Sequence, residues 1–200
     1  NGLNAGTGGA TLSANGSGAM TLTATSNGGS LAKAKVTAGA LRVAGAGDFT
    51  LTHVQNNVGT LAGNLSGSLN FIDNTALTVG TVGGVTGVNV GANTVTIQTL
   101  IGNLSLASGA SVVATGAVAT PLVLASAADF IHSAGASALD AGSGRWLVWS
   151  TNPANDTRGG LPANFKQYNA TYLSTPVAQA GGNGFRQWLA PSMAPGLQGA

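Results

Sequence analysis

Several residue types that carry chemistry in other proteins are missing or rare in this chain of 200 residues. It contains no cysteine, which excludes disulfide bonds and thiolate catalysis. It contains no glutamate, so its five acidic residues are all aspartates. Only 6% of the residues are charged, and no run of lysine or arginine supplies the basic surface that nucleic-acid binding needs. The sequence therefore predicts no nucleic-acid partner.

Membrane-spanning and targeting segments are missing as well. No stretch of about 18 consecutive apolar residues occurs, so the sequence predicts no transmembrane helix. Residues 1–20 lack the basic and apolar regions of a signal peptide, and residue 1 is an asparagine. We therefore expect the sequence to be part of a longer or processed polypeptide.

Helical patterns are scarce, whereas alternation is common. No window of about 11 or more residues combines a period of about 3.6 with a helix cap. Across residues 67–124, apolar residues come in pairs separated by one residue, mostly Asn, Thr or Ser. This alternation predicts strands with one buried face. The pairs are Leu69/Phe71, Leu77/Val79, Val88/Val90, Val95/Ile97, Leu104/Leu106 and Leu122/Leu124.

These pairs recur at a nearly constant spacing. One set begins at Leu69, Val88, Leu104 and Leu122, and a second begins at Leu77, Val95 and Val112. Phe49 and Leu51 precede Leu69 and Phe71 by a similar spacing, which extends the repeat upstream. Such repetition predicts a parallel β-helix, a solenoid whose coils stack on one another. A sandwich or barrel is the alternative, but its hairpins would not require one recurrent coil length.

Composition divides the chain into four parts. Residues 1–18 are a loose lead-in or first coil, and residues 19–143 are the predicted coils. Residues 144–190 are rich in aromatic residues and predict a less regular β segment, either a terminal coil or cap or a module junction. Residues 191–200 read as a linker-like tail.

The aromatic-rich part carries a family resemblance. Its segments are residues 122–140 (LVLASAADFIHSAGASALD), 144–153 (GRWLVWSTNP), 160–172 (GLPANFKQYNATY) and 182–185 (GNGF). They resemble the filamentous-haemagglutinin-like exoproteins of Gram-negative bacteria, over about residues 120–190. The sequence departs from the family at residues 185–188 (FRQW), where the family carries a more apolar run.

The resemblance implies a right-handed parallel β-helix in a very long surface or secreted adhesin. It also implies export by two-partner secretion, and hence an outer-membrane export partner. The family's secretion domain and its asparagine-containing recognition motif are not found in this sequence. We therefore expect a stalk or repeat region located outside the cell or on its surface, with contact to a host or neighbouring cell made by other parts of the chain.

Residues that could carry chemistry are few. The five aspartates are not predicted to converge, and His53 and His132 lie several coils apart, so we expect no catalytic, metal or cofactor site. Aromatic residues beside Asn and Gln could form a glycan-binding platform, or could cover the end of the solenoid. These candidates are Trp146, Trp149, Phe165, Tyr168, Tyr172 and Trp188. Candidate glycosylation sequons begin at Asn15, Asn64, Asn103, Asn155 and Asn169.

The sequence thus predicts a non-enzymatic structural segment of a bacterial adhesin. One alternative is a subunit of a self-assembling extracellular filament, because open solenoid ends expose strand edges that support end-to-end association. A second alternative is a glycan-binding or polysaccharide-active β-helix module, which requires either exposed aromatic residues on one face or clustered acidic residues in a cleft.

Overall fold

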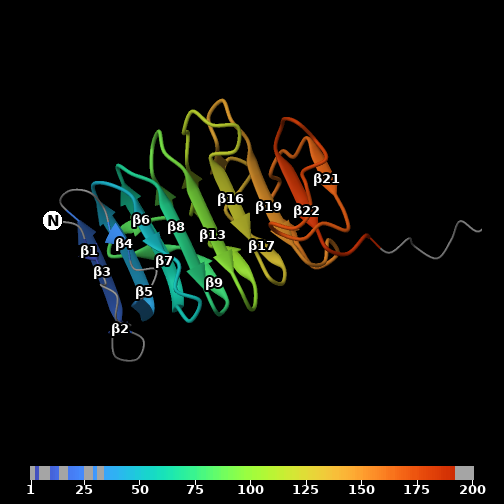
Figure 1. The fold of residues 1–200 in the computed structure, drawn as a ribbon. Coiled ribbons are helices and arrows are strands. Elements are labelled where there is room, and N and C mark those ends of the chain that lie inside the picture. Colours follow the sequence, from blue (N-terminus) through green and yellow to red (C-terminus); the bar gives the residue numbers. More distant parts are fainter. Residues whose placement is uncertain (1–2, 5–9, 14–17, 25–28, 31–33, 192–200) are drawn as a thin grey trace, which may run out of the picture.

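The computed structural model describes residues 3–4, 10–13, 18–24, 29–30 and 34–191. Within these residues the protein consists of strands and loops without a helix, and its strands stack into a parallel β-solenoid (Figure 1). The predicted all-β parallel solenoid is therefore confirmed, while its right-handed coiling stays a prediction. Most of the predicted lead-in, the sequon at Asn15 and residues 192–200 of the predicted tail lie outside the described residues.

Two parallel sheets form the walls of the solenoid. The first, sheet A, runs the length of the rod in Figure 1 from the blue to the red end. Its described strands lie in the order β1 (Leu3–Asn4), β4 (Gly29–Ser30), β6 (Phe49–Leu51), β8 (Leu69–Asp73), β13 (Val95–Thr99), β16 (Leu122–Ala125), β19 (Trp146–Ser150), β22 (Gly184–Gln187) and β21 (Phe165–Gln167).

The second wall, sheet B, starts from long strands and continues with short ones. Among the described residues, β2 (Ala10–Ser13) and β3 (Ala19–Ala24) both pair with β5 (Ala34–Gly45), which pairs with β7 (Asn57–Leu65). Beyond β7 the sheet divides into two lines of strands. One line is β12 (Val88–Asn89), β15 (Val112–Val113) and β18 (Leu139–Asp140); the other is β9 (Leu77–Val79), β14 (Leu104–Leu106), β17 (Phe130–His132) and β20 (Thr157–Arg158).

Strand β7 is the point at which the coil lengthens. Its Thr60 and Leu61 pair with β9, whereas its Gly63 and Asn64 pair with β12. Between β9 and β12 the chain inserts an antiparallel hairpin of β10 (Thr81–Val82) and β11 (Val85–Thr86). The coils that begin at β8, β13 and β16 therefore carry three strands, one in sheet A and two in sheet B.

This lengthening contradicts the predicted spacing of the coils. In sheet A, Leu69 pairs with Val95 and Val95 with Leu122, so the repeat is longer than the predicted step from Leu69 to Val88. Leu69 and Val88, which were predicted to be stacked neighbours, lie in different sheets. The upstream step from Phe49 to Leu69 is confirmed, because these two residues pair. The later steps were wrong because all three strands of a coil alternate alike, so spacing alone does not identify the stacked partner.

The core is built from straight rows of apolar side chains that point between the sheets. One row of sheet A passes from one strand to the next through Phe71, Ile97, Leu124, Val148 and Phe185, each at most 1% exposed. Full burial of one such side chain stabilises the fold by roughly 1.5–3 kcal/mol. Because the rows run parallel to the axis, they hold successive coils in register.

Candidate functional site

The aromatic candidates divide between the inside and the outside of the solenoid. In β19 the side chains alternate, so that Trp146 and Val148 face the core while Leu147 and Trp149 face outwards. Trp146 is 1% exposed and its ring contacts Phe185 edge-on at 5.3 Å between centroids. It therefore has no face left for a ligand and instead fills the last full coil of the core.

The remaining aromatic residues lie on the outer face of sheet A or beside it. A second apolar cluster on this face has Leu147, Trp149 and Ala125 at its centre. Val123, Phe165, Tyr172 and Val177 pack against it. Tyr172 and Val177 come from residues 168–183, a segment that we call the strap, which joins β21 to β22. Tyr168 is half-buried in the strap, and Trp188 is 52% exposed just after β22.

The strap exists because the last two strands of sheet A are placed out of chain order. After β20 the chain forms β21 at the edge of the sheet, and β22 then inserts between β19 and β21. The insertion requires a glycine at the start of β22. A Cβ atom at Gly184 would lie 2.2 Å from Cζ of Phe165, so the Phe165 ring occupies the space that a side chain would need. The chain must then cross the outer face of sheet A to connect the two strands.

One lateral row on this face explains where a groove forms. The row passes through Ile72, Gln98, Ala125, Trp149 and Arg186 on successive strands. Alanine is the smallest member, so the surface is hollow between Gln98 and Trp149. The resulting groove has a volume of about 250 Å³. It is lined by Gln98, Thr99, Leu100, Ala125, Ser126, Ala127, Trp149, Ser150, Thr151, Ala170, Thr171, Tyr172 and Trp188.

Arg186 is only 1% exposed, and its side chain holds the strap against the sheet. Its Nη2 donates to the carbonyl oxygens of Thr175 and Pro176, both at 2.8 Å, and its Nε donates to Oε1 of Gln167 at 3.0 Å. Burial, and secondarily the charge of Arg145, lowers the pKa of Arg186 from its ordinary value. The guanidinium is therefore held by neutral oxygens and an aromatic ring rather than by a carboxylate.

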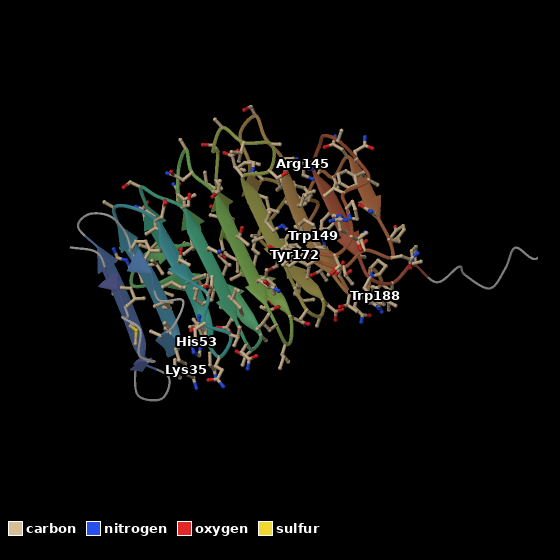
Figure 2. All side chains as sticks on the ribbon, in the orientation of Figure 1. Lys35, His53, Arg145, Trp149, Tyr172 and Trp188 are labelled. Atoms are coloured by element: carbon tan, nitrogen blue, oxygen red, sulfur yellow. The ribbon has the colours of Figure 1, made fainter. Side chains whose placement is uncertain are left out.

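That aromatic ring belongs to Trp149, which forms the floor of the groove. The guanidinium carbon of Arg186 lies 4.7 Å from the centroid of the Trp149 ring, and Tyr172 meets the same ring edge-on at 5.1 Å. Trp149 is 6% exposed, and its indole Nε1 is buried with no hydrogen-bond partner among the described residues. Figure 2 shows Trp149 and Tyr172 close together on the outer face, with Trp188 nearer the end of the rod. Of Trp149, Tyr172 and Trp188, Trp188 is thus the residue whose ring is most accessible to a ligand.

A row of buried polar side chains follows the corner where sheet A turns towards sheet B. Asp73 Oδ2 accepts from the backbone N of Val58 at 2.8 Å, and Ser126 Oγ accepts from the backbone N of Leu104 at 3.0 Å. Burial raises the pKa of Asp73, although its hydrogen bonds to Thr75 and Val58 oppose this shift. Sequence reasoning missed this row, whose signal is a polar residue two positions after the last core-facing apolar residue of a sheet A strand. Its members are Asp73, Thr99, Ser126, Ser150 and Gln187.

Three of the four other carboxylates also accept hydrogen bonds from the backbone or from this row. Asp48 Oδ1 accepts from the backbone N of Ser68, and Asp140 Oδ1 from that of Gly142. Asp156 joins the last corner, where its Oδ2 accepts from Ser150 Oγ at 2.6 Å and from Gln187 Nε2 at 2.7 Å. Within the described part of the chain, no three His, Asp or Glu side chains are placed to hold a metal ion.

The two histidines have different surroundings, and Figure 2 shows that His53 lies, like Lys35, towards the opposite end of the rod from Trp188. His132 is 2% exposed, stacks on Phe130 at 5.9 Å, and bonds through Nε2 to the carbonyl oxygen of Gly135. Burial lowers the pKa of His132 from its ordinary value.

The sequons are spread over the surface rather than gathered at one site. Asn64, Asn155 and Asn169 are exposed, whereas Asn103 is half-buried and its Oδ1 accepts from the backbone N of Asp129. Asn169 lies in the strap with a φ of 53°. Glycosylation at these positions stays a prediction.

Comparison with known proteins does not identify a family for this chain. No family model, no curated protein and no solved structure matches it. In the part of the chain that the structure describes, no helix has the length and apolarity to cross a membrane.

Proposed function

We propose that the chain is a rigid, non-enzymatic structural segment of a large bacterial surface or secreted adhesin. In this role it holds other binding regions of its parent chain away from the cell. The continuous apolar rows support the proposal, because they make neighbouring coils share one core. The hydrogen bonds between parallel strands run along the rod axis, so bending or stretching the rod strains many of them together. The resemblance of residues 120–190 to filamentous-haemagglutinin-like exoproteins supports the surface location and the two-partner export.

The observation that carries the proposal is how the apolar rows end. In sheet A the core-facing row that reaches Phe185 ends at Lys166 of β21, which is exposed. In sheet B the corresponding row passes from Leu106 to His132 and then to Arg158. The Arg158 guanidinium lies 5.0 Å from the centroid of the Phe185 ring. Cations therefore close the core at this end of the rod.

This closure favours a segment with a finished end over a repeating filament subunit. A strand of another chain that added to β21 would place its core-facing residue beside the Lys166 ammonium, which is costly to desolvate. The edge that β21 offers is also only three residues long. We therefore place the capped end of the rod at β21, with the strap and Trp188 on its flank.

The mass of the native polypeptide tests this proposal. Antibodies against this segment would detect the parent chain from cell surface and culture medium under fully denaturing conditions. We expect a polypeptide several times larger than 19.3 kDa. A polypeptide close to 19.3 kDa that is recovered as fibres would refute the proposal in favour of a filament subunit.

A further inference from the structure

We propose that the groove on the outer face of sheet A binds a neutral oligosaccharide, with Trp188 as the surface on which a sugar ring stacks. This site goes beyond the structural role of the rod and does not depend on it. The oligosaccharide would bind to the side of the rod.

The charge of the lining determines the class of ligand. Among the described residues, no acidic or basic side chain lines the groove, and the guanidinium of Arg186, which packs against Trp149, is 1% exposed beneath the strap. An anionic ligand such as a phosphate or a uronic acid would give up its hydration without gaining an ionic partner. The groove therefore favours a ligand that is polar but uncharged.

The polar groups of the lining match the hydroxyl groups of a sugar. Gln98 brings an amide, which both donates and accepts. Thr151 Oγ1 donates to the carbonyl oxygen of Ala127 at 2.8 Å, so its lone pairs stay available to accept a hydrogen bond. A sugar hydroxyl can satisfy both kinds of group, because it donates and accepts as well.

The exposed indole supplies the apolar part of the recognition. Trp188 lines the groove and is 52% exposed, whereas one face of Trp149 is covered by the Arg186 guanidinium. The π-face of an indole is electronegative. The C–H groups on one face of a pyranose ring carry a slight positive charge and pack well against such a face. Trp188 is thus the aromatic side chain that can stack on a sugar without first moving.

The groove is elongated and already formed. It reaches from Gln98 on β13 across β16 and β19 to Trp188 beyond β22, which is three strand spacings or about 14 Å. This length suits several linked sugar units better than one. The wall formed by Ala170, Thr171 and Tyr172 belongs to the strap, which Arg186 holds through the carbonyls of residues 175 and 176. Little conformational entropy is therefore lost when a ligand binds.

Calorimetric titration of the 200-residue chain with oligosaccharides of known structure tests the site. The panel holds neutral gluco-, galacto- and manno-configured oligosaccharides, their uronate counterparts and one neutral proline-rich peptide. We expect at least one neutral oligosaccharide to bind with a Kd below about 10 mM, and its uronate counterpart and the peptide to bind at least about tenfold more weakly.

Three variants and a control locate the binding. Trp188→Ala removes the stacking surface and should weaken binding about tenfold or more, as should Ala125→Gln, which fills the hollow. If Ala125→Gln lowers the melting temperature, Gln98→Ala replaces it as the second binding variant, because it changes the outer face and leaves the core intact. Val118→Ala truncates another exposed apolar side chain, 52% exposed and outside the groove, and should leave the Kd unchanged.

Several results would overturn the proposal. They are the absence of any neutral ligand with a Kd below about 10 mM, equal binding of the uronates, or preferred binding of the peptide. Retention of full affinity by folded Trp188→Ala and Gln98→Ala would place the ligand elsewhere. None of these results depends on the mass of the parent polypeptide, so the binding site and the structural role are tested independently.

Discussion

An engineered disulfide tests the coil register most directly, because the natural chain has no cysteine. Asn70 and Thr96 pair across β8 and β13 on the outer face of sheet A. Adjacent strands lie about 4.8 Å apart, which falls within the range of Cα separations that a disulfide spans. The double substitution Asn70→Cys and Thr96→Cys should therefore form a bond on mild oxidation.

The length of the closed loop sets the size of the effect. The bond would close a loop of about 26 residues, for which the chain-entropy relation gives about 3.5 kcal/mol as an upper limit. For a domain of this size, that corresponds to a rise in melting temperature of roughly 7–14 °C, less any strain in the bond. Thiol titration reports bond formation, and melting of the oxidised and reduced forms reports the stabilisation.

The control pair follows the shorter repeat that the sequence suggests. Asn89 follows Asn70 by the same step that leads from Leu69 to Val88, but it belongs to β12 in sheet B. The double substitution Asn70→Cys and Asn89→Cys should therefore keep two free thiols. Formation of this bond, or failure of the Asn70 and Thr96 pair to oxidise, would refute the three-strand coil.

Three further predictions concern stability. Burial lowers the pKa of His132 below its ordinary 6.5, so the unfolded chain gains a proton first as the pH falls. The unfolding free energy should therefore be constant above about pH 6.5 and fall as the pH drops below that value. Urea titrations at several pH values measure this decrease, which should disappear in His132→Leu and remain in His53→Gln. Ser126→Ala removes the hydroxyl that accepts from the backbone N of Leu104 and Ala128. Because the Leu104 N–H still reaches the carbonyl oxygen of Asp129 at 3.2 Å, the change should cost only about 0.5–1.5 kcal/mol, whereas exposed Ser137→Ala should cost less than about 0.5 kcal/mol. Gly184→Val collides with the Phe165 ring and should expose the amides of β21 to hydrogen exchange while those of β8 stay protected.

The sequence predicted the fold class because the physics of that signal is local. Alternation of apolar and polar residues determines which face of a strand is buried, whatever strand lies beside it. The opposite orientations of Trp146 and Trp149 followed from the same rule. The step from Phe49 to Leu69 was also correct, because only one strand of sheet B, β7, lies between β6 and β8.

The candidate site was only partly predictable. The concentration of aromatic residues after residue 144 correctly indicated the end of the rod at which the site lies. It did not show that Trp146 lies in the core, that Arg186 covers one face of Trp149, or that Trp188 stays exposed. These differences depend on which side chains of other strands lie next to each ring.

The amino-acid sequence by itself thus determined the strands, their buried faces and the absence of a thiol or a charged surface, all of which depend on residue type and near neighbours. Only the tertiary structure decided which strands stack, that β22 inserts between β19 and β21, and that Ala125 leaves a groove beside the strap. The physical reason is that these features depend on contacts between residues one or more coils apart in the chain, such as Ser68 with Asp48 and Ala127 with Thr99. Many pairings of similar strands satisfy the same local pattern, and packing of the whole core selects one of them.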